Sequence, residues 1–298
     1  MAGVHISEHM KGLAITSAGV LVLSPDALLL RMLSIDSWTT VMWRSLLMSL
    51  VLLAAMAIVE RGRPWAAFRG VGRWGLLSSI LYAANATSFV YSIHNTAVAN
   101  TLVIIACSPL IAAVFSRIFL GERVAPETWI ATTLVAVGIA VVFWDGLGRG
   151  TLHGDLAALA TAFFLAGNFT ILRFRKHINM IPATALGGFW AALAMLGLGL
   201  AAPFSLNEQD VLVMALLGLV VVPLAFGLIT IGPRYITAPE VGLLLLLETV
   251  LGPLWVWLAL NERASDTALM AGGFVVATLL VYFTVRLRRQ QGPVWVRS

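Results

Sequence analysis

Long apolar runs separated by short polar segments make up most of the chain. Ten runs can be traced, at about residues 12–31, 39–59, 74–93, 98–118, 128–145, 154–173, 182–203, 210–232, 239–260 and 266–286. Each is close to the roughly 20 residues that an α-helix needs to cross the hydrocarbon core of a bilayer. Only His94–Thr96 divides the third run from the fourth, in a stretch without formal charge from Trp74 to Ser116. The pattern predicts an all-α integral membrane protein with ten transmembrane helices.

Composition agrees with this class of protein and excludes most others. Hydrophobic residues make up 60% of the 298 residues and charged residues 11%, whereas a soluble domain carries about 25% charged residues. A soluble core of this size could not hide so much apolar surface. Ten helices use about 200 residues, so the remainder suffices for loops and tails but not for a folded soluble domain.

Lysine and arginine are distributed unevenly between the two sets of loops. With the N-terminus inside, the inner set holds Lys11, Arg61, Arg63, Arg69, Arg73, Arg117, Arg123, Arg173, Arg175, Lys176, Arg234, Arg286, Arg288, Arg289 and Arg297. The outer set holds Arg31, Arg149 and Arg263, and Arg44 lies within a span. Because inner loops are enriched in Lys and Arg, this bias predicts that both termini are cytoplasmic and that the span count is even. The net charge of +5 comes from basic residues in loops, where they orient the helices. We therefore expect no nucleic-acid partner.

A faint internal repeat divides the chain into two halves. With a shift of 140 residues, Leu120–Arg123 lies on Leu260–Arg263. Gly121 and Asn261 are the residue types that best adopt the left-handed conformation that ends a helix. Pro126 and Ser265 then suit the start of the following helix.

A shift of 142 residues places Pro25–Asp26 on Gly167–Asn168 and Leu30–Arg31 on Leu172–Arg173. The shared loop positions predict two five-helix repeats, at 1–148 and 149–298. An odd number of spans per repeat inverts the second half relative to the first. The identity between the halves is low, so chance similarity is the alternative.

Ten spans in about 300 residues, with Gly121–Arg123 and Asn261–Arg263 after spans four and nine, resemble the drug/metabolite transporter superfamily. The chain is most similar to the branch built from two EamA-type repeats, from about Lys11 to Arg289. The resemblance implies a secondary transporter in the bacterial inner membrane that exports small metabolites. Within this superfamily, the bacterial aromatic amino-acid exporters are the nearest likeness. It implies a membrane-embedded monomer or homodimer without a cofactor.

Three ionisable residues lie deep within predicted spans, where charge is costly and often functional. Asp26 and Arg44 both lie five residues from the outer end of their spans, roughly 7 Å deep at 1.5 Å per residue. They could form a structural ion pair between neighbouring helices. Alternatively, Arg44 could receive a substrate carboxylate, because its planar guanidinium donates two parallel hydrogen bonds. Asp26 would then hold Arg44 or meet an ammonium group.

Glu248 lies near the middle of the ninth span, after four leucines and before Gly252–Pro253. It could couple transport to protons or bind a substrate ammonium group. The alternative is a protonated acid hydrogen-bonded to a neighbouring helix. Prolines within spans, here Pro25, Pro109, Pro223 and Pro253, interrupt helices, and interrupted helices line the substrate sites of many transporters.

Further candidates for the substrate site are mid-span polar or aromatic residues: Tyr82, Asn85, Asn168, Trp43 and Trp190. For Asn85, a hydrogen bond between helices is the alternative to a hydrogen bond with a ligand. For the two tryptophans, the alternative is packing against lipid.

Other signals do not carry a function. The G-x-G-x-x-G pattern at Gly70–Gly75 lies in a basic loop with no preceding strand, so it does not indicate a dinucleotide site. The histidines are dispersed, and no spacing of metal ligands occurs. We therefore predict no enzyme, metal or cofactor, but a transporter of small amphipathic metabolites, with amino acids first. Drug-like cations, nucleosides or sugar derivatives are the alternative cargo, and an intramembrane lipid-modifying enzyme is the more distant one.

Overall fold

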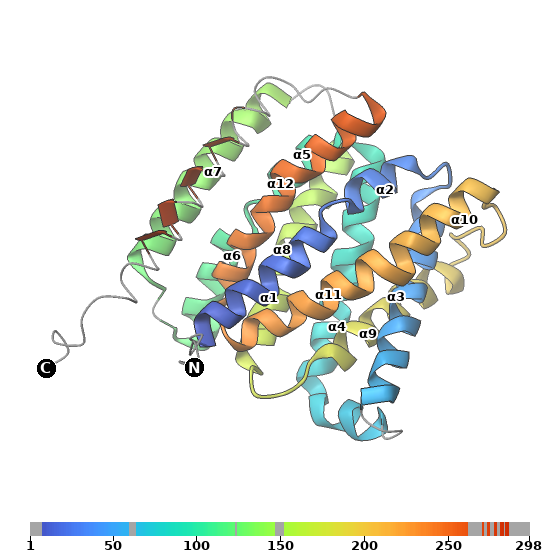
Figure 1. Cartoon of the computed structure of the whole chain (residues 1–298), viewed down its shortest axis with the longest axis horizontal. Coiled ribbons are helices and arrows are strands. Elements are labelled where there is room, and N and C mark those ends of the chain that lie inside the picture. Colours follow the sequence, from blue (N-terminus) through green and yellow to red (C-terminus); the bar gives the residue numbers. More distant parts are fainter. Residues whose placement is uncertain are drawn as a thin grey trace, which may run out of the picture.

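A computed structural model describes residues 8–59, 64–122, 124–146 and 152–261, together with 270, 273–274, 277–278, 281–282 and 284–285. Within these residues the chain is helical and contains no strand. Figure 1 shows the long helices packed as one bundle.

The helices follow the apolar runs closely. They are α1 (Glu8–Leu23), α2 (Asp26–Met32), α3 (Ser37–Val59), α4 (Pro64–Asn95), α5 (Val98–Ile105), α6 (Ser108–Phe115), η1 (Ser116–Leu120), α7 (Pro126–Gly146), α8 (Leu152–Phe174), α9 (Ile181–Gly197), α10 (Glu208–Ala215), η2 (Leu216–Val221), α11 (Val222–Ile231), η3 (Gly232–Arg234) and α12 (Ala238–Leu260).

Within the described residues, seven helical segments are long and apolar enough to cross a membrane. They are Glu8–Met32, Ser37–Val59, Phe68–Asn95, Val98–Leu120, Leu152–Phe174, Glu208–Arg234 and Ala238–Leu260. The helical, multi-pass architecture is thereby confirmed. The helix α9 has 17 residues, and α7 covers the predicted fifth span. The predicted tenth span, 266–286, lies mostly outside the described residues, so the total of ten stays a prediction.

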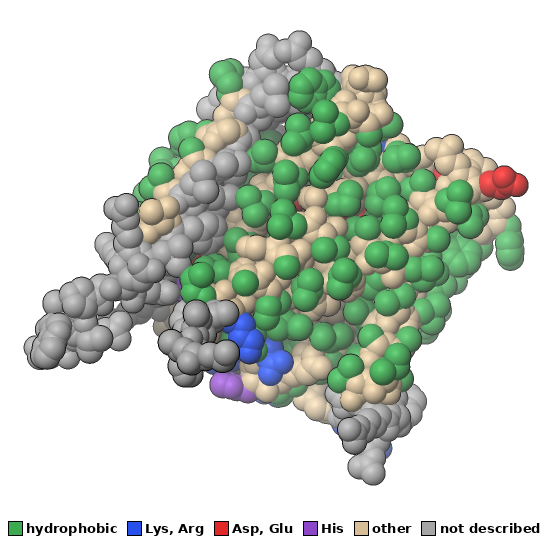
Figure 2. Space-filling view, viewed as in Figure 1, with side chains coloured by type: hydrophobic (Ala, Val, Ile, Leu, Met, Phe, Trp, Pro, Cys, Tyr) green, Lys and Arg blue, Asp and Glu red, His purple; other side chains and the backbone are tan. Residues whose placement is uncertain are grey.

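The surface of the bundle is that of a protein surrounded by lipid. Figure 2 shows hydrophobic side chains over the face formed by α1, α11 and α12. Lys and Arg gather near the start of α1, and an acidic side chain lies at the opposite end, near α10. Large apolar residues such as Leu212 and Leu258, 72% and 61% exposed, would be costly in water but are stable against acyl chains.

Among the described spans, the first and the fourth are each interrupted by a break. The first breaks between α1 and α2 at Ser24–Pro25, and the fourth between α5 and α6 at Ala106–Cys107. Pro25 and Pro109 lack the amide hydrogen that would continue the helix. By contrast, Pro253 lies inside α12, which continues through it. Before Pro223, the wider π-turns of η2 precede α11.

The predicted helix ends are confirmed. Gly121 has φ 65° and Asn261 has φ 55°, both in the left-handed region that closes a helix. Pro126 begins α7, as expected from its fixed φ. Ser265 lies outside the described residues.

Small residues allow the central helices to approach closely. The helix α9 packs against both α3 and α4, and α4 also packs against α8. Gly188 faces Ser45, Met48 and Ser49 of α3 with no room for a side chain. The Ser49 hydroxyl donates to the Ala185 carbonyl oxygen at 2.6 Å. Close backbone approach and interhelical hydrogen bonds are what hold helices together in lipid.

Candidate functional site

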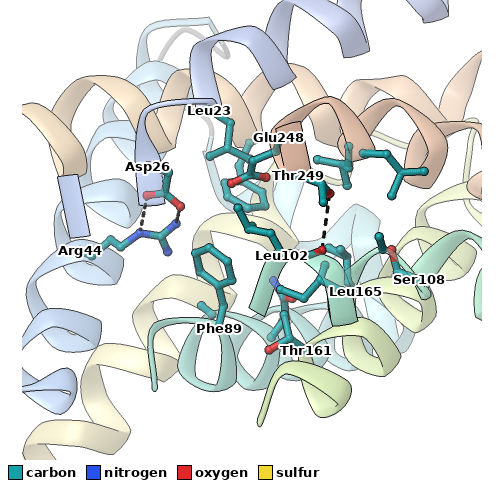
Figure 3. Close-up of a pocket in the computed structure, with 17 residues that line it drawn as sticks. Leu23, Asp26, Arg44, Phe89, Leu102, Ser108, Thr161, Leu165, Glu248 and Thr249 are labelled. Carbon is teal, nitrogen blue, oxygen red and sulfur yellow. Dashed lines mark hydrogen bonds and ion pairs between the residues drawn. The ribbon is translucent and has the colours of Figure 1, made fainter. Parts of the chain in front are cut away.

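A small cavity lies at the centre of the bundle, beside both helix breaks. Its volume is about 40 Å³, and it is lined from α1, α2, α3, α4, α5, α6, α8, α11 and α12. Four of the predicted site residues line it: Asp26, Arg44, Asn85 and Glu248. Figure 3 shows Asp26 and Arg44 on one side of the cavity and Glu248 near them.

Asp26 and Arg44 form a buried two-point ion pair. Arg44 Nη2 donates to Asp26 Oδ2 at 2.7 Å, and Arg44 Nε donates to Asp26 Oδ1 at 3.3 Å (Figure 3). The Arg44 side chain is 3% exposed and the Asp26 side chain is 1% exposed. This geometry uses one edge of the guanidinium and fixes its orientation. The third nitrogen, Nη1, takes no part in this pair.

The backbone around this pair holds it in place. Asp26 is the first residue of α2, directly after the break. The Ser24 hydroxyl donates to the Leu21 carbonyl oxygen at 2.9 Å and accepts from Trp255 Nε1 of α12 at 3.1 Å. Ser24 therefore connects the helix break before Asp26 to α12, the helix that carries Glu248.

The start of α3 is fixed by Asp36, which positions Arg44 two turns later. Asp36 Oδ1 accepts from the amides of Trp38 and Thr39 at 2.9 and 3.0 Å. The Thr39 hydroxyl donates to Asp36 Oδ2 at 2.6 Å. Burial opposes ionisation of Asp36, but these hydrogen bonds outweigh it and lower the pKa of its carboxyl below the ordinary value.

Glu248 and Asn85 carry oxygens without a partner. Among the described residues, nothing donates a hydrogen bond to Glu248 Oε1 or Asn85 Oδ1, although both atoms are buried. The residues are 8% and 6% exposed. A buried acceptor without a donor is costly, by about 1–3 kcal/mol for a neutral group and more for a charged one. These two oxygens can therefore accept hydrogen bonds from a ligand.

Two glycines on α12 let this helix pack closely beside the cavity that Glu248 lines. A side chain at Gly242 would meet Pro109 at 3.1 Å, and one at Gly252 would meet Leu102 at 2.6 Å. The helix α12 therefore lies close against both halves of the broken fourth span. The Thr249 hydroxyl points to the Leu102 carbonyl oxygen at 3.5 Å (Figure 3).

Most of the remaining lining is apolar, and Ser108 adds a hydroxyl group. Leu102, Ile105, Leu165, Phe226 and Leu245 form most of the wall. The Thr161 hydroxyl donates to the Ala157 carbonyl oxygen at 2.8 Å, so its hydrogen is already used within the helix. A ligand here would meet polar groups at one end and hydrocarbon elsewhere, as in most small-molecule sites.

Phe89 is a part of the site that the sequence reasoning missed. Its ring lies under the Arg44 guanidinium, with Arg44 Cζ 5.9 Å from the ring centroid, and it also lines the cavity. A cation over an aromatic face is attracted to it. Phe89 follows Asn85 by one helical turn, so the two share a face. That spacing was the available signal.

The other four predicted site residues do not line this cavity. The Tyr82 hydroxyl lies 2.9 Å from Met48 Sδ, and Asn168 Oδ1 accepts from the Ser78 hydroxyl at 2.6 Å. Trp43 Nε1 donates to the Pro203 carbonyl oxygen at 3.1 Å. Trp190 is 37% exposed on the outside of the bundle. These contacts join helices or face lipid.

Polar contacts also join the two halves of the chain away from the cavity. At the end of the N-terminus, His9 Nε2 lies 2.9 Å from Glu240 Oε1. At the opposite end, the Ser34 hydroxyl donates to Asp210 Oδ2 at 2.7 Å. Both pairs join elements from different halves of the chain.

Comparison with known proteins gives three results. A family model described as "EamA-like transporter family" matches residues 11–144 and 152–284. An "uncharacterized transporter" of Vibrio cholerae serotype O1 is 30% identical over 164 residues, which are 48% of this chain and 51% of that protein. The match thus spans about half the length of this curated relative. A crystal structure superposes with a TM-score of 0.76 at 19% identity, over 92% of this chain and 98% of that one, a likeness in fold.

Proposed function

Because the chain belongs to the EamA-like transporter family, we propose that it is a secondary transporter that exports small amphipathic metabolites, with amino acids as the preferred cargo. Family membership points to a transporter and not to an enzyme. The proposal for amino acids rests on one observation. A guanidinium whose Nη1 takes no part in its ion pair lines the same cavity as two buried oxygens that have no donor among the described residues.

That arrangement complements a zwitterion. A substrate carboxylate would accept from Arg44, while Glu248 or Asp26 would take the ammonium group or a proton. The apolar wall would hold the substrate's side chain. The cavity of about 40 Å³ has room for a few water molecules, each needing roughly 10–15 Å³. An amino acid is larger, so the helices must separate for it to bind.

Helix packing supports two inverted repeats, here proposed as 1–148 and 149–298, and hence alternating access. The helix α4 packs on α8 as α11 packs on α1. Likewise, α5 and α6 pack on α8 as α12 packs on α1 and α2. If the two halves of the chain are interchanged, each of these helix pairs takes the place of its counterpart. Two related repeats that face each other should show such matching contacts. In such transporters the site lies between the repeats and one bundle rocks against the other.

The location proposed is the bacterial inner membrane, with both termini in the cytoplasm and ten spans in all. The bias of Lys and Arg toward one set of loops supports this orientation. The protein would act as a monomer or homodimer in the bilayer.

A second candidate cargo is a drug-like cation without a carboxylate. The observation that favours it is the ion pair, because Asp26 already occupies one edge of the Arg44 guanidinium. The ammonium group of such an amine would bind Glu248 and Asn85, and Arg44 would not be required.

Counterflow in proteoliposomes tests the proposal with three matched compounds. L-phenylalanine has both charged groups, 2-phenylethylamine lacks the carboxylate, and 3-phenylpropionate lacks the amine. We expect labelled L-phenylalanine to accumulate in vesicles loaded with unlabelled L-phenylalanine, above the level in protein-free vesicles, and neither truncated compound to match it. Equal accumulation of 2-phenylethylamine would establish the cation as cargo. Absence of accumulation for all three, with folded protein, would contradict the proposal.

A further inference from the structure

Three basic residues from distant parts of the sequence meet at the end of the bundle where α1 begins. Lys11 lies in α1, Lys176 follows α8, and Arg234 ends η3. Because cytoplasmic loops are enriched in Lys and Arg, this end is the proposed cytoplasmic end. We propose that the three residues bind the phosphate group of an anionic phospholipid of the surrounding membrane. This inference goes beyond the proposed function, because it concerns a lipid and not the cargo.

Contacts within the fold hold these three residues close together. Arg234 Nε donates to the Lys176 carbonyl oxygen at 3.2 Å, which joins η3 to the end of α8. The Lys11 ammonium group lies 4.9 Å from the centroid of the Tyr235 ring, and Tyr235 directly follows Arg234. A side chain at Gly12 would lie 2.5 Å from Tyr235 Cβ, so α1 packs directly against this part of the chain. The three cations therefore surround one short segment, residues 232–236.

A buried-side contact fixes the segment 232–236 before any lipid binds. Arg173 Nη1 donates to the carbonyl oxygens of Pro233 and Ile236, both at 3.3 Å. Arg173 Nε donates to Glu122 Oε1 at 2.8 Å, so the charge of Arg173 is already balanced. Since the segment is already ordered, a lipid would not have to pay for ordering it, which favours binding.

Little negative charge opposes the three cations. Within the described residues, neither 175–180 nor 232–237 contains an acid. Glu8, one turn before Lys11, is an exposed acid of α1. The carboxylate of Glu240 caps the start of its own helix, α12. The cluster therefore keeps a net positive charge, and Lys and Arg form charge-assisted hydrogen bonds with phosphate oxygens.

The position of the cluster points to a lipid and not to a soluble anion. Lys11 and Arg234 are exposed, and Figure 2 shows Lys and Arg near the start of α1, beside the hydrophobic face of α1, α11 and α12. Acyl chains would lie along this face while the phosphate group stays at the basic residues. Anionic lipids of the cytoplasmic leaflet attract basic residues in such positions.

Lipid titration of the purified protein tests the site without a transport assay, so its outcome is separate from that of the proposed function. The protein in neutral detergent would be titrated with dioleoyl phosphatidylglycerol, with dioleoyl phosphatidylcholine, or with glycerophosphoglycerol. The last has the phosphodiester of phosphatidylglycerol but no acyl chains. Native mass spectrometry would count the bound molecules. We expect phosphatidylglycerol to bind more tightly than phosphatidylcholine, and glycerophosphoglycerol not to bind measurably.

Two double variants assign the binding to this cluster. In Lys11→Gln/Arg234→Gln the affinity for phosphatidylglycerol should fall about 30-fold, since each basic residue near an anionic lipid contributes a factor of about five. The affinity for phosphatidylcholine should not change. Arg73→Gln/Arg117→Gln is the matched control, because it removes the same charge from exposed positions of α4 and η1. Equal losses in the two double variants would overturn the assignment.

A milder variant and the wild type decide the question if the first double variant does not fold. Lys176→Gln keeps the backbone carbonyl that accepts from Arg234, and its affinity for phosphatidylglycerol should fall about five-fold. An unchanged affinity in Lys176→Gln would remove this residue from the site. In the wild type, equal binding of the two lipids, or binding of glycerophosphoglycerol as tight as that of phosphatidylglycerol, would overturn the proposal.

Discussion

Arg44→Gln is expected to abolish transport of L-phenylalanine and to lower the free energy of unfolding by about 3–5 kcal/mol. The loss of stability follows because Asp26 would remain as a buried carboxylate without its partner. The loss of transport follows because no guanidinium remains to receive the substrate carboxylate. Counterflow and thermal unfolding in detergent measure the two effects.

The double variant Asp26→Asn/Arg44→Gln separates a structural ion pair from a substrate site. It removes both charges together, so no uncompensated charge remains, and most of the lost stability should return. Transport of L-phenylalanine should stay lost, because the guanidinium is still missing. If the double variant folds and transports L-phenylalanine as the wild type does, the pair serves the fold alone.

Gly188→Ala is expected to lower the free energy of unfolding by about 1–3 kcal/mol, the usual cost of overpacking. Its new methyl group would lie 2.5 Å from Met48 Cε, 2.5 Å from Ser49 Oγ and 2.8 Å from the Ser45 carbonyl oxygen. The last of these is backbone, so α9 must move away from α3, which carries Arg44. Thermal unfolding and counterflow should both decline.

The matched control is Gly197→Ala on the same helix. Nothing lies within 4 Å of the position a methyl group would take there, and alanine favours the helix more than glycine does. Its stability should be unchanged or slightly increased. A Gly188→Ala variant as stable as Gly197→Ala would contradict the close packing of α9 on α3.

Much of the fold can be predicted from local features of the sequence. Span positions follow from the apolar runs, and the helix ends at Gly121 and Asn261 follow from residue type. The Asp26–Arg44 pair could be predicted from the shared depth of the two residues on adjacent helices, because opposite charges within a membrane usually pair.

The inward-facing residues could not all be identified in this way. A helix that is hydrophobic all round gives no periodic signal for its buried face. Asn85 and Asn168 therefore look alike in sequence, yet Asn85 lines the cavity and Asn168 bonds to Ser78. The same reason hides Phe89, whose place under Arg44 depends on how α3 and α4 cross.

The central claim is that substrate occupies the cavity between Arg44 and Glu248. Protection of an introduced cysteine tests it most directly. In a Cys107→Ser background, Thr161→Cys places a thiol in the cavity lining and Gly197→Cys places one at the exposed end of α9. Saturating L-phenylalanine should slow maleimide modification at position 161 and not at 197. Equal rates at position 161 with and without L-phenylalanine would contradict the account.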